Sequence, residues 1–160
     1  MLAALFVLSV VTILLWAVGR PARRLLTALG EESTFILNVT KPTTAALERI
    51  AKGQLPKFRG FFFAMTVTST DVEVWSDRSN PVRVISIPLS AVTTLTVAQI
   101  KESGYPIPVV VAEVLPTPHG ATVSLPLAFA IKRLGSYGPP SAQKMGLIRD
   151  RFARAVGVSP

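Results

Sequence analysis

Residues 58–75 read FRGFFFAMTVTSTDVEVW. Two runs rich in aromatic and β-branched residues, Phe58–Thr68 and Val72–Trp75, flank the polar triplet Ser69-Thr70-Asp71. Such runs favour extended backbone, and a short polar segment between them favours a reversal of the chain. The stretch therefore predicts a β-hairpin. The hairpin also indicates a larger sheet, because two strands with an apolar face are marginally stable without further strands or a packed helix.

The strand-and-turn pattern continues downstream of this hairpin. A turn rich in glycine and proline is expected at Ser103–Pro108, and a breaker loop at Gly135–Pro140. Pro126 lacks the amide hydrogen that a ladder needs, so its strand belongs at a sheet edge or carries a bulge. The further predicted strands are Val82–Ile87, Val92–Ile100, Val109–Leu115 and Ala121–Ile131.

Helices are predicted on either side of the strands. Thr40–Lys52 carries cap and stop signals of a helix and follows a short apolar run at Thr34–Val39, which is prone to form a strand. The C-terminal segment Ser141–Val156 is predicted to be an amphipathic helix with one apolar stripe. Its opposite side carries three basic residues, which are candidates for contact with an anionic surface: Lys144, Arg151 and Arg154.

The N-terminal segment is the most apolar part of the chain. Met1–Val18 has no charged residue, and a helix of that length rises about 27 Å, at the short end of what spans a bilayer. Arg20, Arg23 and Arg24 follow it and are candidate contacts of lipid headgroups. The positive-inside rule then predicts a single-pass membrane protein with its N-terminus outside and its C-terminal domain in the cytoplasm.

The segment Pro21–Leu29 can either continue the anchor helix, which would lengthen the span, or form a short interfacial helix, and Gly30 then ends it. The N-terminal segment Met1–Val18 can also be a cleaved signal peptide, although it lacks a basic start and a small-x-small cleavage site. The favoured division of the chain is a transmembrane anchor at 1–19, a basic linker with a helix at 20–56, and a β domain at 57–160.

The fold class predicted for the chain is α+β: a transmembrane helix, then an antiparallel β half-barrel of six or seven strands that a C-terminal helix closes. This order resembles bacterial pleckstrin-homology-like (PH-like or GRAM-like) domains next to a transmembrane helix. The stretches that carry the resemblance are FRGFFFAMTVTSTDVEVW, RVISIPLSAVTTLTV and KMGLIRDRFARAV. Lipid-binding members carry basic residues around the first hairpin turn, whereas Ser69-Thr70-Asp71 has none.

Charge and composition limit the partners and the chemistry. The formal net charge of +8 suits an anionic partner, and the absence of cysteine excludes disulfides and thiolate catalysis. No phosphate-binding glycine loop, metal-ligand cluster or catalytic constellation is recognisable, so no cofactor, metal or enzymatic activity is predicted. The only histidine, His119, lies in a turn, where histidines are usually idle. Phe61 and Phe63 are expected in the core, with Phe62 undecided, so nucleic-acid stacking is disfavoured.

The leading functional hypothesis is a membrane-anchored binding or scaffold module that serves as an accessory subunit of a membrane protein assembly. The expected partners are the lipid bilayer and other membrane subunits. One alternative is a sensor of anionic lipid surfaces, which would use the basic residues beside the anchor and on the last helix. The other is an enzyme, or a secreted domain from which the N-terminal segment has been removed.

Overall fold

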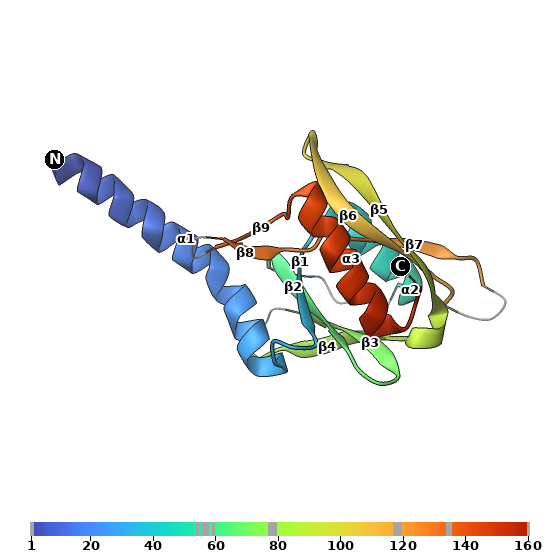
Figure 1. Ribbon diagram of the computed structural model, residues 1–160. Coiled ribbons are helices and arrows are strands. Elements are labelled where there is room, and N and C mark those ends of the chain that lie inside the picture. The colour runs from blue at the N-terminus through green and yellow to red at the C-terminus, as the bar shows by residue number, and fades with distance from the viewer. Residues whose placement is uncertain are drawn as a thin grey trace.

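A computed structural model describes residues 2–53, 55, 58, 60–76, 80–116, 120–133 and 136–159. Within this part, helices precede, interrupt and follow the strands (Figure 1). The elements are α1 Leu2–Leu29, β1 Thr34–Asn38, α2 Lys41–Ile50, β2 Phe62–Val67, β3 Asp71–Ser76, β4 Val82–Pro88, the 3₁₀ helix η1 Leu89–Ala91, β5 Val92–Glu102, β6 Tyr105–Val114, β7 Val123–Leu127, β8 Ile131–Arg133, β9 Ser136–Gly138 and α3 Ala142–Val156.

The strands are antiparallel, as predicted, but they do not form one half-barrel. The described residues make three sheets, with strand orders β1-β2-β3-β4, β5-β6-β7 and β8-β9, and none of them closes on itself. Pro88 ends β4, and η1 then turns the chain before β5 begins, so one ladder does not continue from β4 into β5. The α+β class is therefore confirmed, and the predicted β half-barrel is wrong.

The strand predicted over Ala121–Ile131 is divided in two. β7 ends at Leu127, and the chain then crosses to the outer edge of β1. There the amide of Asn38 donates to the Ala128 carbonyl and that of Ala130 donates to the Ile36 carbonyl, each at 2.8 Å. β8 follows this crossing. The edge position expected from Pro126 is confirmed, because β7 is the last strand of its sheet.

The turn predicted over Ser103–Pro108 is shorter than expected. Only Ser103 and Gly104 make the reversal, both with positive φ angles of 51° and 86°. The strand β6 therefore includes Pro106 and Pro108, which lie opposite residues of β5. Because β7 pairs only with the second half of β6, both proline nitrogens can face an edge where no ladder bond is needed.

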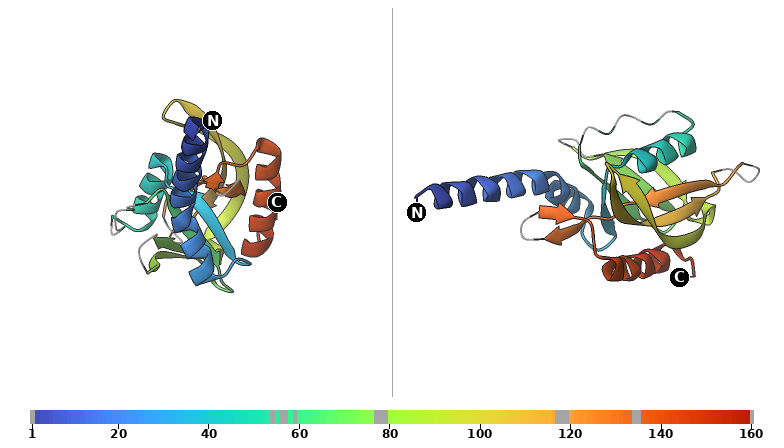
Figure 2. Two further views of the ribbon diagram at one scale, coloured as in Figure 1. Left: turned by 90° about the vertical axis from the view of Figure 1, so that its left-hand side faces the viewer. Right: turned by 90° about the horizontal axis from the view of Figure 1, so that it is seen from above.

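The main core lies between the two larger sheets and α3. Phe152 of α3 is buried there, with its ring edge-on to Phe35 of β1 and Phe129, at centroid distances of 5.3 and 5.7 Å. The predicted C-terminal helix is confirmed, since Ser141 caps its start and Gly157, with a φ of 74°, caps its end. Figure 2 shows α2 and α3 on opposite sides of the strands.

A second apolar cluster joins α1 to the other face of β1 and β2. Ala22 and Leu25 of α1 are fully buried and belong to one cluster with Ile36 and Phe62. Because β2 is covered on both faces, Phe62 and its neighbour Phe63 are both buried. Phe61 precedes β2 and is 75% exposed, so its predicted place in the core is wrong.

The predicted transmembrane anchor at residues 1–19 is also wrong. Within the part of the chain that the structure describes, no helix combines the length and the apolar character that crossing a bilayer requires. The single-pass topology, and with it the predicted location in the cell membrane, is corrected by this finding. The helix does not end at the arginines: it continues through Pro21 to Leu29, which was one of the two predictions for that segment, and packs its last turns onto the sheet.

Candidate functional site

A cleft of about 450 Å³ lies where α1, β1, the β8–β9 hairpin and α3 meet. Its volume falls in the range of small-molecule sites. The lining residues are Arg23, Leu26, Thr27, Glu31, Thr34, Phe35, Ile36, Phe129, Ala130, Ile131, Lys132, Tyr137, Ile148 and Arg151.

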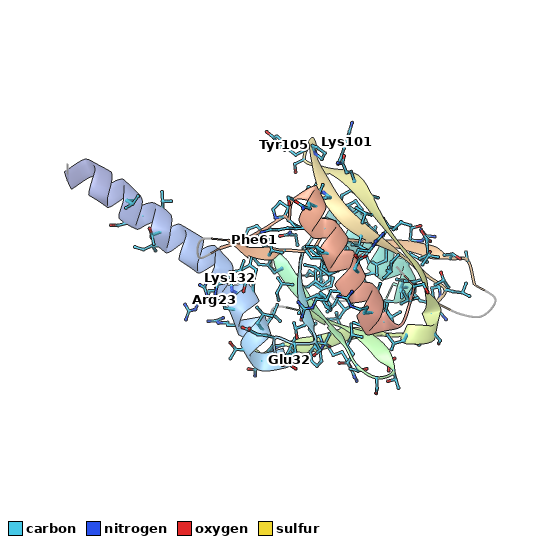
Figure 3. The ribbon with its side chains drawn as sticks, in the orientation of Figure 1. Arg23, Glu32, Phe61, Lys101, Tyr105 and Lys132 are labelled. Atoms are coloured by element: carbon cyan, nitrogen blue, oxygen red, sulfur yellow. The ribbon has the colours of Figure 1, made fainter. Side chains whose placement is uncertain are left out.

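The lining of this cleft is apolar at its base and charged around it. Phe35, Ile36 and Phe129 are buried, whereas Lys132 is exposed and Arg23 is half-buried. Figure 3 shows Arg23 and Lys132 at the junction between α1 and the body of the protein. An apolar pocket with a few converging polar groups is the usual form of a ligand site.

Arg151 reaches the cleft from α3 and is held in position by neutral groups. Its guanidinium carbon lies 5.0 Å from the centre of the Phe35 ring, and its Nη2 donates to the carbonyl of Glu32 at 2.8 Å. Both of these contacts are to neutral groups, so neither of them neutralises the positive charge that Arg151 brings to the cleft.

Thr34 lines the same cleft and carries a hydroxyl without a hydrogen-bond partner. The residue is only 5% exposed, and its Oγ1 is buried with no hydrogen-bond partner in the described part of the chain. Thr66, directly opposite on β2, is also buried, but its hydroxyl accepts from Trp75 at 2.9 Å and donates to Glu73 at 3.4 Å. Buried polar atoms are normally paired, so an unpaired one in the wall of a cleft is a candidate partner for a ligand atom.

Removal of the Thr34 hydroxyl is expected to stabilise the protein. Thr34→Val keeps the shape of the side chain and removes an unsatisfied buried group, so the free energy of unfolding should rise by roughly 1 kcal/mol. The matched change Thr66→Val should lower it by about 1–3 kcal/mol, because it deprives the Trp75 indole of its acceptor. Urea unfolding of both variants followed by circular dichroism checks this, and destabilisation by Thr34→Val would contradict it.

Tyr137 supplies a second hydroxyl from β9. Burial raises the pKa of its phenol, the nearby Glu31 carboxylate raises it further, and the Arg23 guanidinium opposes both effects. A phenol is protonated at neutral pH even at its ordinary pKa, so Tyr137 can donate a hydrogen bond there. Tyr137 therefore adds a donor to the cleft without adding a charge.

The structure separates the predicted basic residues into two kinds. Arg23 and Arg151 line the cleft, although the sequence placed them in separate groups. The other four are exposed on α1 or α3 outside its lining: Arg20, Arg24, Lys144 and Arg154. Contact of the two groups with lipid headgroups or an anionic surface stays a prediction.

Five polar residues of the cleft were not singled out from the sequence as site residues: Thr27, Glu31, Thr34, Lys132 and Tyr137. Nothing in their local sequence pattern distinguished them. Among the described residues, no group of three or more histidine, aspartate or glutamate side chains could hold a metal ion. His119 lies outside the described residues.

Comparison of the chain with protein-family models, curated proteins and solved structures finds no match. The resemblance to PH-like domains therefore stays a prediction.

Proposed function

We propose that the chain is a non-catalytic binding module and that its ligand occupies the cleft between α1, β1, β8–β9 and α3. The observation that carries this proposal is the Thr34 hydroxyl, which is buried and unpaired in a cleft of ligand size. A ligand atom that pairs with this hydroxyl would recover a hydrogen bond that the free protein leaves unmade. The proposal keeps the binding role predicted from the sequence, without the membrane anchor.

The chemistry of the lining favours binding over catalysis. Covalent catalysis requires a nucleophile within hydrogen-bond reach of a base. Among the described residues, the lining holds no cysteine, histidine or serine. The Thr27 hydroxyl donates at 2.9 Å to the Arg23 carbonyl in its own helix. The one lining carboxylate, Glu31, is exposed, so it is poorly placed to act as a desolvated general acid or base.

A blocking substitution on α1 tests the proposal. Thr27→Trp places a large side chain at an exposed position that lines the cleft, and Ala28→Trp places the same side chain at the next position, which does not line it. A library of small soluble compounds is screened by amide chemical shifts of the full chain. We expect binders that shift cleft residues in the parent and in Ala28→Trp, and that lose about tenfold or more in affinity with Thr27→Trp.

Two results of this screen would overturn the proposal. One is a library without any compound that shifts the amides of cleft residues. The other is a set of binders whose affinity is the same in both tryptophan variants, because such binders would sit elsewhere on the protein.

A further inference from the structure

We infer that the cleft binds an amphipathic oxyanion, meaning a carboxylate or phosphate head carried on an apolar tail. This inference rests on the proposed function and names the class of ligand. It is drawn from three independent properties of the lining: its hydrogen-bond donors, its charge and its apolar base.

The polar side chains of the lining are mostly donors. The Thr34 and Tyr137 hydroxyls, the Lys132 ammonium and the two guanidiniums can all donate, and Glu31 is the one obligate acceptor. A ligand head that satisfies such a lining must therefore be rich in acceptors. Carboxylate and phosphate oxygens meet this need, because they accept several hydrogen bonds and offer no competing donor when ionised.

The charge of the lining favours an anion. Arg23, Lys132 and Arg151 bring three positive charges to the cleft, and Glu31 brings one negative charge. The bond from Arg151 to the Glu32 carbonyl fixes the guanidinium without neutralising it. An anionic head can therefore gain both a hydrogen bond to the buried Thr34 hydroxyl and attraction to cations, which a neutral head cannot.

The apolar base of the cleft favours a ligand with an apolar part over a small inorganic ion. Leu26, Ile36 and Ile148 enter it from α1, β1 and α3, and the Phe35 and Phe129 rings complete it. A free phosphate would leave this surface in contact with water. A ligand with an apolar tail covers it and gains the hydrophobic contribution of the surface that is buried.

The test compares ligands that carry the head, the tail or both. Octanoate and octyl phosphate carry both parts, 1-octanol carries the tail alone, and inorganic phosphate the head alone. Binding to the full chain is measured by titration calorimetry and amide shifts. We expect at least one of the two amphiphiles to bind at least tenfold more tightly than either single-part control, with shifts at cleft residues. Which of the two binds more tightly distinguishes a carboxylate head from a phosphate head.

Matched variants tie this affinity to the cleft. Arg151→Met removes a lining cation from α3, whereas Arg154→Met removes an exposed cation of the same helix that does not line the cleft. Amphiphile affinity should fall about five- to tenfold with Arg151→Met and with Thr34→Val, and stay within about twofold with Arg154→Met. Binding of 1-octanol should not respond to any of the three.

Two outcomes overturn the inference: 1-octanol binding as tightly as the amphiphiles, or amphiphile binding that neither Arg151→Met nor Thr34→Val weakens. These failures are distinct from failure of the proposed function. If compounds without an anionic head bind the cleft and are blocked by Thr27→Trp, the binding module stands and the ligand class is wrong. If nothing binds the cleft, both fail together.

Discussion

Replacing Phe152 with alanine should lower the free energy of unfolding by about 3–5 kcal/mol. The side chain is 1% exposed and belongs to a trio of aromatic rings with Phe35 and Phe129, in which each pair meets edge-on. Truncation removes these ring contacts and leaves a cavity between α3 and the sheets, which the surrounding backbone can fill only in part. The loss is large beside the roughly 5–15 kcal/mol that stabilises an ordinary domain.

Phe61→Ala is the matched control for Phe152→Ala. It removes the same atoms from a side chain that is already 75% exposed, so its effect should stay within about 0.5 kcal/mol. Urea unfolding followed by circular dichroism compares the two variants with the parent chain. Equal midpoints for both variants would show that α3 does not close the core as described.

Leu25→Ala should lower the free energy of unfolding by roughly 2–5 kcal/mol. Leu25 has no exposed surface and packs with Ala22, Ile36 and Phe62. It therefore holds α1 against β1 and β2. The substitution should also raise hydrogen exchange in the last turns of α1, because they lose their main apolar contact.

Leu8→Ala provides the comparison on the same helix. Leu8 is 67% exposed, so the change removes little packing and should leave the unfolding midpoint nearly unchanged. Both variants are measured by urea unfolding and hydrogen exchange of the full chain. A negligible effect of Leu25→Ala would mean that α1 does not contribute to the folded body, and the cleft beside it would lose one of its walls.

Elements with local signals were predictable from the sequence. α2 lies within the predicted helix Thr40–Lys52, and the Thr40 hydroxyl caps its start by accepting from the Thr43 amide. α3 likewise follows from the cap at Ser141 and its apolar stripe. The hairpin of β2 and β3 forms where the polar triplet separated two β-prone runs. In each case the deciding interactions lie within a few residues of one another along the chain.

Features that depend on distant segments were not predictable. Alternation along Ala121–Ile131 indicated one strand, but pairing of Ala128 and Ala130 with β1 divides it. Phe61 was predicted in the core and Phe62 was left undecided, but Phe62 is the buried one, because α1 docks on the face of β2 where Phe62 lies. The anchor was predicted from the hydropathy of the first 18 residues alone, whereas α1 extends to Leu29 and packs on the sheet.

The cleft was the least predictable feature. Its walls come from α1, β1, β8–β9 and α3. Thr34 is a candidate ligand contact only because its hydroxyl has no partner among the described residues. Single residues could suggest that the surface is basic, as Arg23 and Arg151 did. Their meeting at one cleft is a property of the tertiary structure.

The prolines of β6 have a consequence for how the protein behaves at high concentration. Exposed strand edges commonly recruit strands from neighbouring molecules, since their free amide hydrogens act as a template. Pro106 and Pro108 remove those hydrogens from alternate positions of the outward edge near the hairpin tip. The long β5–β6 hairpin can therefore extend into solvent, while the prolines on its exposed edge disfavour the intermolecular ladders from which fibrils grow.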